Sequence, residues 1–176
     1  MTAISINLNI WNIVSRHLLL QTRSEKEQAA FLFGRYEADL STIQIIDHQL
    51  MIDEDFASQS GDYLELQDTT RALLIKRAHM QRACLIEVHS HPGSHRAVFS
   101  TFDFLGLQET VPHMQWRLRG QPYVAIVVAG KTFDALVWTV GARDPTGLHA
   151  INVGERTLAP TNLSVGRWKG IKNDSV

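Results

Sequence analysis

The chain of 176 residues has little cysteine, little proline and no long apolar run. Its single cysteine, Cys84, excludes an internal disulfide and any zinc site built from thiolates alone, and it fits a reducing compartment. No apolar stretch approaches the roughly 20 residues that cross a bilayer. Residues 1–10 lack the basic start and apolar core of a signal peptide. We therefore expect a cytoplasmic protein.

An excess of charge of one sign is also lacking. The 17 basic and 18 acidic residues leave a formal net charge of −1 at pH 7, and no dense block of Lys and Arg occurs. Proteins that bind nucleic acid or an anionic membrane usually carry a basic patch. We therefore expect neither nucleic acid nor a membrane among the partners.

Strands that alternate with helices are predicted along most of the chain. Apolar and isoleucine-rich stretches indicate buried strands, and apolar residues at helical spacing indicate the helices between them. Residues 52–62 are polar and predict a surface loop. The pattern is typical of an α/β domain with helices packed on a mixed β-sheet. The expected strands are 5–10, 29–34, 42–50, 83–88, 123–128 and 133–140, and the expected helices run from about 10 to 23, from 68 to about 82 and from 101 to near Pro112.

The composition changes after Gly141, where Gly, Pro, Asn and Arg become frequent. Residues 151–158 predict one added strand, and the last fifteen or so residues predict an extended, flexible tail. We therefore expect one main domain over residues 1–141 and a C-terminal extension over residues 142–176.

The segment from His89 to Asp103 carries the clearest chemical signal. His89 and His91 lie two positions apart at the end of a predicted strand, so both imidazoles point to the same side. A catalytic zinc site keeps three protein ligands, and Asp103, in the first turn of the next predicted helix, is the best third candidate. Ser100 lies on the same turn, where its hydroxyl could stabilise an oxyanion.

Another interpretation accounts for two of these residues without catalysis. Ser100 followed three positions later by Asp103 is also the pattern of a helix N-cap with a capping box. A pair of histidines in a His-x-His arrangement is, moreover, more often structural than metal-binding. The occurrence of both patterns in one loop favours the metal site.

The segments His89-Ser-His-Pro and Ser100-Thr-Phe-Asp103 together resemble the JAMM motif of the JAB/MPN metalloproteases, His-x-His-Pro followed by Ser-x-x-Asp. In that family an upstream glutamate activates a water molecule at the zinc. The run from Glu27 to Gly34 is similar to the element that carries this glutamate. The resemblance implies one Zn²⁺ ligated by His89, His91 and Asp103.

The same resemblance implies the other functional residues. Glu27 is the expected general base, with Glu25 as the fallback, and Ser100 is the second catalytic residue. Apart from the resemblance, His95 and Arg96 are candidate substrate contacts because they lie in the loop between the histidines and Ser100.

The resemblance also implies a fold and an activity. The fold is a cytidine-deaminase-like α/β/α sandwich with a mixed β-sheet flanked by helices. The activity is zinc-dependent cleavage after the C-terminal glycine of ubiquitin or a ubiquitin-like protein, for processing or deconjugation. The chain looks like bacterial JAB proteins that are encoded beside activating enzymes, conjugating enzymes and ubiquitin-like proteins, in operons of which several act in antiphage defence. Two alternatives stay open: a hydrolase that releases cysteine from a sulfur-carrier conjugate, and a catalytically inactive scaffold subunit.

Overall fold

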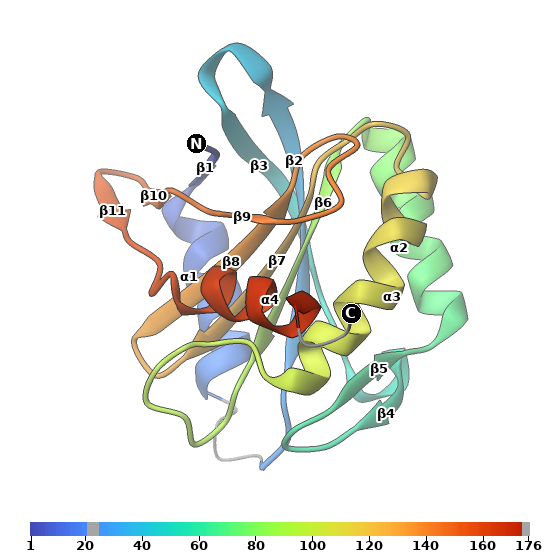
Figure 1. Cartoon of the computed structure of the whole chain (residues 1–176), viewed down its shortest axis with the longest axis vertical. Helices are drawn as coiled ribbons and strands as arrows, with labels where there is room; N and C mark the ends of the chain where they lie inside the picture. Colours follow the sequence, from blue (N-terminus) through green and yellow to red (C-terminus); the bar gives the residue numbers. More distant parts are fainter. Residues whose placement is uncertain (21–24, 174–176) are drawn as a thin grey trace.

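A mixed β-sheet runs through the middle of the molecule in the computed structural model, which describes residues 1–20 and 25–173 (Figure 1). Within these residues nine strands form the sheet, in the order β11-β10-β1-β3-β2-β6-β7-β8-β9. β1 pairs in parallel with β10 and β3, β6 pairs in parallel with β7, and the other neighbours are antiparallel. The strands are β1 (Ala3–Ile6), β2 (Ala29–Glu37), β3 (Thr42–Leu50), β6 (Cys84–Ser90), β7 (Tyr123–Ala129), β8 (Thr132–Trp138), β9 (Thr146–Gly147), β10 (Ile151–Val153) and β11 (Arg156–Leu158), and a separate hairpin pairs β4 (Phe56–Gln59) with β5 (Leu64–Leu66).

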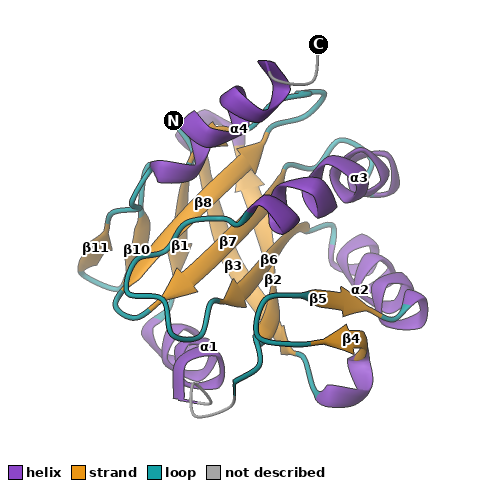
Figure 2. Ribbon diagram, turned by 60° about the horizontal axis from the view of Figure 1, so that its bottom comes forward, coloured by secondary structure: helices purple, strands orange, loops and turns teal. Residues whose placement is uncertain are grey.

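Helices cover both faces of the sheet (Figure 2). Side chains of α1 pack in the core on one face, and side chains of α2, α3 and α4 pack in the core on the other. This three-layer arrangement confirms the α/β expectation. None of the helices within residues 1–20 and 25–173 combines the length and apolarity needed to cross a membrane. The helices are α1 (Leu8–Leu20), α2 (Asp68–Gln81), α3 (Thr101–Arg117) and α4 (Leu163–Asn173), with short 3-10 turns at Ala38–Leu40 and Asp53–Asp55.

The two cores follow from the alternation of side chains along the strands. In β2, Phe31 and Phe33 face α2 and α3, whereas Ala30 and Leu32 face the side of α1. Because successive side chains point to opposite faces, a central strand covered on both sides reads as a continuous apolar run.

The first strand is shorter than the predicted 5–10, because a helix begins at Leu8. The side-chain oxygen of Asn7 accepts a hydrogen bond from the amide of Ile10 at 2.8 Å, which is the bond of a helix N-cap. The cap ends the strand even though the apolar and polar alternation continues past it. The predicted helix end near Arg23 lies outside the described residues.

The expectation that the third helix stops near Pro112 is wrong, since α3 continues to Arg117. Proline inside a helix costs about 3 kcal/mol. Met114 and Leu118, beyond the proline, are buried at 2% and 3% exposure. Burial of each such side chain stabilises the fold by about 1.5–3 kcal/mol, which is enough to offset the proline.

The segment 52–62 is not a simple loop, because it contains a 3-10 turn and β4. The C-terminal residues also differ from expectation. The span 151–158 forms two strands, β10 and β11, and the idea of an extended, flexible tail is wrong, because Leu163–Asn173 is helical. The buried ring of Trp168 packs edge-on against Phe104 and Trp138 and anchors this helix to the core.

Candidate metal centre

The pairing of β2 with β6 brings the segment that follows Glu27 next to the strand that carries His89. Leu85 of β6 faces the core beneath α3, so Glu87 and His89 share its face by alternation, whereas Ile86 and Val88 face α1. His89 pairs with Ala29 across the antiparallel ladder. At the end of this ladder the Ser90 amide donates to the Gln28 carbonyl at 2.9 Å, and Glu27 lies close to His91.

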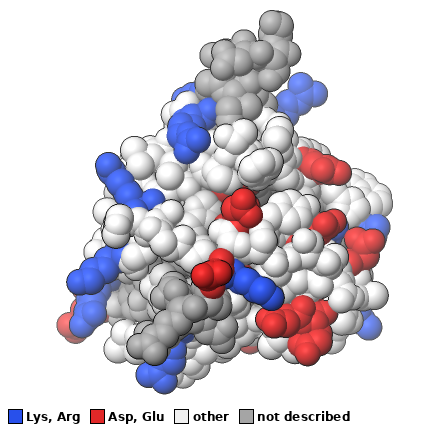
Figure 3. All heavy atoms as spheres, turned by 90° about the horizontal axis from the view of Figure 1, so that it is seen from below, with Lys and Arg blue, Asp and Glu red and all other residues white. Residues whose placement is uncertain are grey.

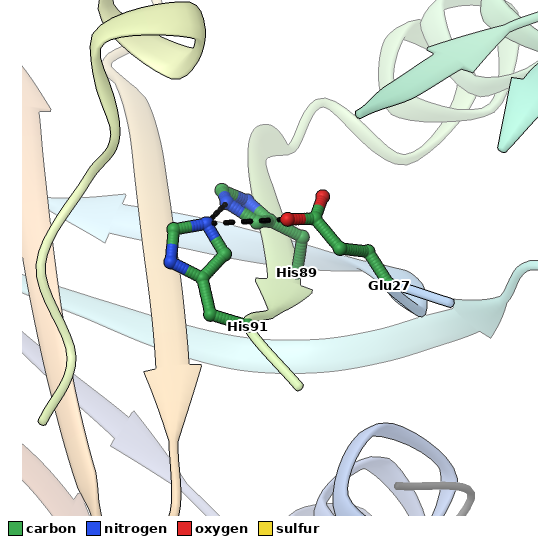
Figure 4. Close-up of side chains that lie close together, drawn as sticks. All are labelled: Glu27, His89 and His91. Atoms are coloured by element: carbon green, nitrogen blue, oxygen red, sulfur yellow. Dashed lines mark hydrogen bonds and ion pairs between the residues drawn. The ribbon is translucent and has the colours of Figure 1, made fainter. Parts of the chain in front are cut away.

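The donor atoms of Glu27, His89 and His91 lie within 4.8 Å of one another, close enough to hold a metal ion (Figure 4). His91 Nε2 lies 3.2 Å from His89 Nε2, 3.2 Å from Asp103 Oδ2 and 3.5 Å from Glu27 Oε1. His89 Nε2 lies 3.5 Å from Asp103 Oδ1. Two ligands of one zinc ion at 2.0–2.2 Å in a tetrahedron are roughly 3.3–3.6 Å apart. The donors are therefore spaced like the corners of a zinc site.

Glu27 is held by the β4–β5 hairpin rather than by the sheet. Its amide donates to the carbonyl of Ser60 at 2.7 Å, and its carbonyl accepts from Gln59 Nε2 at 2.7 Å. The hairpin approaches so closely that a Cβ on Gly61 would lie 2.5 Å from the carbonyl oxygen of Glu25. Glu27 is 3% exposed, whereas Glu25 is exposed. Of the two glutamates considered, the structure therefore brings Glu27 to the histidines.

Ser100 and Asp103 form the capping box that was the alternative interpretation. The Asp103 amide donates to Ser100 Oγ at 3.1 Å, and the Ser100 amide donates to Asp103 Oδ2 at 2.6 Å. The cap does not exclude a role at the metal. Asp103 keeps both oxygens near the imidazoles, and Ser100 retains its O–H as a donor because the cap uses only its oxygen.

The carboxylates create a strongly anionic environment around the imidazoles. Burial lowers the pKa of His89, but the hydrogen bond and charge of Asp103 and the charges of Glu27 and Glu87 outweigh it and raise that pKa to about 9. Burial likewise raises the pKa of Asp103, yet hydrogen bonds from His89 and His91 hold it well below its ordinary value. A field that stabilises a proton on His89 also favours a divalent cation in the same place.

The pKa of Glu27 shifts in the opposite direction. Burial raises it to about 7, against the charges of His89 and His91 and with support from Asp103 and Asp62. A carboxylate with this pKa can take up and release a proton near neutral pH.

A groove of about 620 Å³ leads to this cluster. The sheet contributes Ala29, Phe31 and Tyr123, the β4–β5 hairpin forms one wall and α3 forms the other. Besides the carboxylates of Glu27, Glu87 and Asp103, four more line its walls together with the guanidinium of Arg71: those of Asp62, Glu65, Asp68 and Glu109. Seen from below, acidic side chains gather mainly on the half of the molecule that carries β4, β5 and α2, and basic side chains gather on the other half (Figure 3).

This groove was not predicted, because the polar residues 52–62 indicated a surface loop and not a strand of a hairpin. A hairpin signal was present: Phe56 precedes and Leu64 and Leu66 follow a turn segment that contains Gly61. Glu87, on the face of His89, accepts a hydrogen bond from the Tyr123 hydroxyl at 2.5 Å within the groove.

His95 and Arg96 stand apart from the cluster. Both are exposed in the loop between β6 and α3, and neither lines the groove. Their role as substrate contacts stays a prediction.

Comparison with known families gives one match. A family model described as prokaryotic homologues of the JAB domain matches residues 13–141, a span that includes Glu27, both histidines and Asp103. A comparison with curated proteins finds no similar sequence.

Proposed function

The chain belongs to the family of prokaryotic homologues of the JAB domain, and from this premise we propose that it is a zinc-dependent peptidase. Its substrate is a ubiquitin-like protein, cleaved after the C-terminal glycine during processing or deconjugation. The observation that carries this proposal is the spacing of the donor atoms at 3.2–3.5 Å beside a buried carboxylate at the end of a groove.

The donor set fits zinc. Two imidazole nitrogens and a carboxylate are ligands that zinc accepts, and three protein ligands leave a position open for chemistry. His89, His91 and Asp103 would hold the ion. When bound, zinc supplies a Lewis acid that makes hydroxide available near neutral pH.

Two side chains then move protons and stabilise charge. Glu27 accepts a proton from the attacking water and later delivers it to the leaving amine nitrogen, as the bond from carbon to water oxygen forms and the amide C–N bond breaks. Ser100 donates its O–H to the oxygen of the attacked carbonyl, where negative charge develops.

The groove supports a slim, extended substrate. The free edge of a β-hairpin can pair with a peptide in extended conformation, and a tail that ends in glycines has no side chain to obstruct the approach to the metal. The four carboxylates of the walls favour a tail with basic side chains before its glycines. A ubiquitin-like protein with such a tail, and the activating and conjugating enzymes that use it, are the proposed partners. Removal of the ubiquitin-like protein from conjugates that form during phage infection would give the protein a role in antiphage defence.

The test is cleavage of a defined substrate. Zinc-loaded protein is incubated with ubiquitin that carries a peptide after its two terminal glycines, with a version in which both glycines are alanine, and with a version in which the arginines of the tail are alanine. We expect mass spectrometry to show a cut after the second glycine, slower cleavage without the arginines, and no cleavage without the glycines.

A matched pair of variants tests whether the cleavage depends on Glu27. Glu27→Gln should abolish the cut, and Glu25→Gln, at an exposed neighbouring glutamate, should leave it intact. A protein that binds zinc but cleaves none of these substrates, nor a ubiquitin-like protein encoded beside it, is a scaffold rather than a peptidase. Release of free cysteine from a sulfur-carrier conjugate, without cleavage of the peptide-extended substrate, would replace the proposed substrate class.

A further inference from the structure

The loop that joins β6 to α3 has buried backbone groups but no regular secondary structure to satisfy them. Ala97 and Phe99 are both fully buried. Side chains complete their backbone hydrogen bonds: the Ala97 amide donates to Thr132 Oγ1 at 2.7 Å, and the Ala97 carbonyl accepts from Thr161 Oγ1 at 2.8 Å. A buried polar group without such a partner is strongly unfavourable.

Both backbone polar groups of Phe99 are hydrogen-bonded to side chains of α4. Its amide donates to Ser164 Oγ at 3.0 Å, and its carbonyl accepts from the Arg167 guanidinium at 3.0 Å. The same guanidinium lies over the ring of Phe104, 5.6 Å from its centroid. One turn of α4 therefore holds both backbone groups of a single loop residue.

The first turn of α4 is fixed in turn by a fully buried carboxylate, Asp134 of β8. Asp134 accepts hydrogen bonds from the amides of Asn162 at 3.0 Å and Ser164 at 2.8 Å, and from the Ser164 hydroxyl at 2.7 Å. The Ser164 hydroxyl thus donates to Asp134 while it accepts from Phe99. This defines the position of its oxygen relative to the central sheet.

The position of Phe99 affects two of the proposed zinc ligands, His89 and Asp103. Its ring meets the imidazole of His89 edge-on, with ring centroids 5.6 Å apart. The next residue is Ser100, whose capping box with Asp103 orients the carboxylate toward both histidines. A shift of Phe99 would therefore displace two proposed zinc ligands together.

We propose that Ser164 and Arg167 are positioning residues of the zinc site, which act through the backbone of Phe99. They lie beyond residue 141, where the family match ends, so this chain uses its C-terminal helix to complete a centre built from the matched domain. The inference rests on the proposed function insofar as the cluster is taken to bind zinc. It does not depend on the identity of the substrate.

The test separates the hydrogen bonds from α4 to the backbone of Phe99 from the packing of α4 on the core. Arg167→Ala removes the donor to Phe99, and Lys169→Ala, at another exposed basic residue of the same helix, is the matched control. Ser164→Ala removes the hydroxyl and keeps the buried Trp168 anchor. Each variant is measured for hydrogen exchange of the Phe99 amide, for affinity for Zn²⁺ by competition with a chelator, and for kcat and KM.

We expect faster exchange at Phe99 in Ser164→Ala, and zinc affinity about tenfold weaker, since partners that orient metal ligands typically contribute about 10- to 100-fold. Arg167→Ala should show a smaller loss, and Lys169→Ala should match the unmodified protein. In the two positioning variants kcat should fall while KM changes little, because the groove is built from other elements.

Zinc affinity at the unmodified level in Ser164→Ala and Arg167→Ala, despite faster exchange, would overturn the positioning role. Unchanged hydrogen exchange of the Phe99 amide in Ser164→Ala would show that Ser164 does not fix the backbone of Phe99, and the proposal would fail. If the expected losses of zinc affinity appear but no Gly-Gly substrate is cut, the proposed function fails and the positioning role stands. If the unmodified protein binds no zinc, the metal centre and its positioning by α4 both fail.

Discussion

The two faces of β6 make different contributions to this protein. Ile86 and Val88 face α1 and pack in a wholly apolar core, whereas Glu87 and His89, on the same strand, face the groove and the metal centre. From Ile86 to His89 the alternation of the strand thus separates residues of the apolar core from residues of the groove. Substitutions at Ile86 or Val88 should affect folding, and substitutions at Glu87 or His89 should affect metal binding and turnover.

The largest expected effect follows from removal of a histidine. His91→Ala takes away an imidazole with three donor or acceptor groups within 3.5 Å, so zinc affinity should fall more than about 100-fold, beyond the range typical of outer partners of metal ligands. Isothermal titration with Zn²⁺ measures this loss. His79→Ala, at an exposed histidine of α2, is the control and should bind zinc normally. Equal zinc affinity in both variants would show that the metal does not bind at His91.

Substitutions of Glu27 and Asp103 should affect different quantities, namely turnover and zinc affinity. Glu27→Gln removes the proposed general base, so kcat should fall on the order of 10²- to 10⁴-fold while zinc stays bound. Asp103→Asn should weaken zinc binding itself, because its carboxylate contacts both imidazoles. Zinc affinity and single-turnover rates distinguish the two variants. Loss of zinc in Glu27→Gln would make Glu27 a ligand, as its place in the three-residue cluster also permits.

A substitution on the face of β6 that packs against α1 should lower stability and leave zinc affinity unchanged. Ile86 is completely buried, so Ile86→Ala should lower the free energy of unfolding by about 2–5 kcal/mol through lost contacts and a cavity. Zinc affinity of the folded protein should stay close to that of the unmodified chain. Urea denaturation and zinc titration measure the two quantities. A large loss of zinc affinity without loss of stability would mean that the two faces are not separable.

The smallest expected effect is a dependence on alkaline pH at Cys84. Burial raises the pKa of this thiol to about 12 from a reference value of 9.0, against a lowering by backbone hydrogen bonds at Cys84 and Gly34. The unfolded chain ionises first, so this contribution to stability is complete below about pH 9 and is lost as pH rises toward 12. At pH 10 the loss should be about 1.4 kcal/mol.

Urea denaturation at pH 8 and pH 10 measures this loss, with Cys84→Ala as the control that lacks the thiol. The fall in stability should be about 1.4 kcal/mol larger for the unmodified protein than for Cys84→Ala. An identical pH dependence in both would mean that the thiol ionises equally easily in the folded and unfolded chains.

Local pattern predicted most of the central elements. The apolar runs at residues 29–34 and 123–128 lie within β2 and β7 and are buried, and a short turn at Gly130 joins β7 to β8. The errors occur where a single contact overrides the pattern. Asn7 begins a helix inside an alternating segment, burial beyond Pro112 extends α3 past a proline, and Trp168 anchors a helix in a glycine-containing segment.

The sequence by itself indicated the candidate site residues, since the His-x-His spacing puts two imidazoles on one face of a strand and Ser100 precedes Asp103 by one helical turn. Only the tertiary structure decided how they meet. Glu27 is 62 residues from His89 and comes close to the histidines through the pairing of β2 with β6 and the hydrogen bonds of the β4–β5 hairpin, and Ser164 comes to Phe99 through the packing of α4. Spacing along the chain specifies local geometry alone, whereas contacts between distant residues depend on sheet register and packing, which involve the whole fold at once.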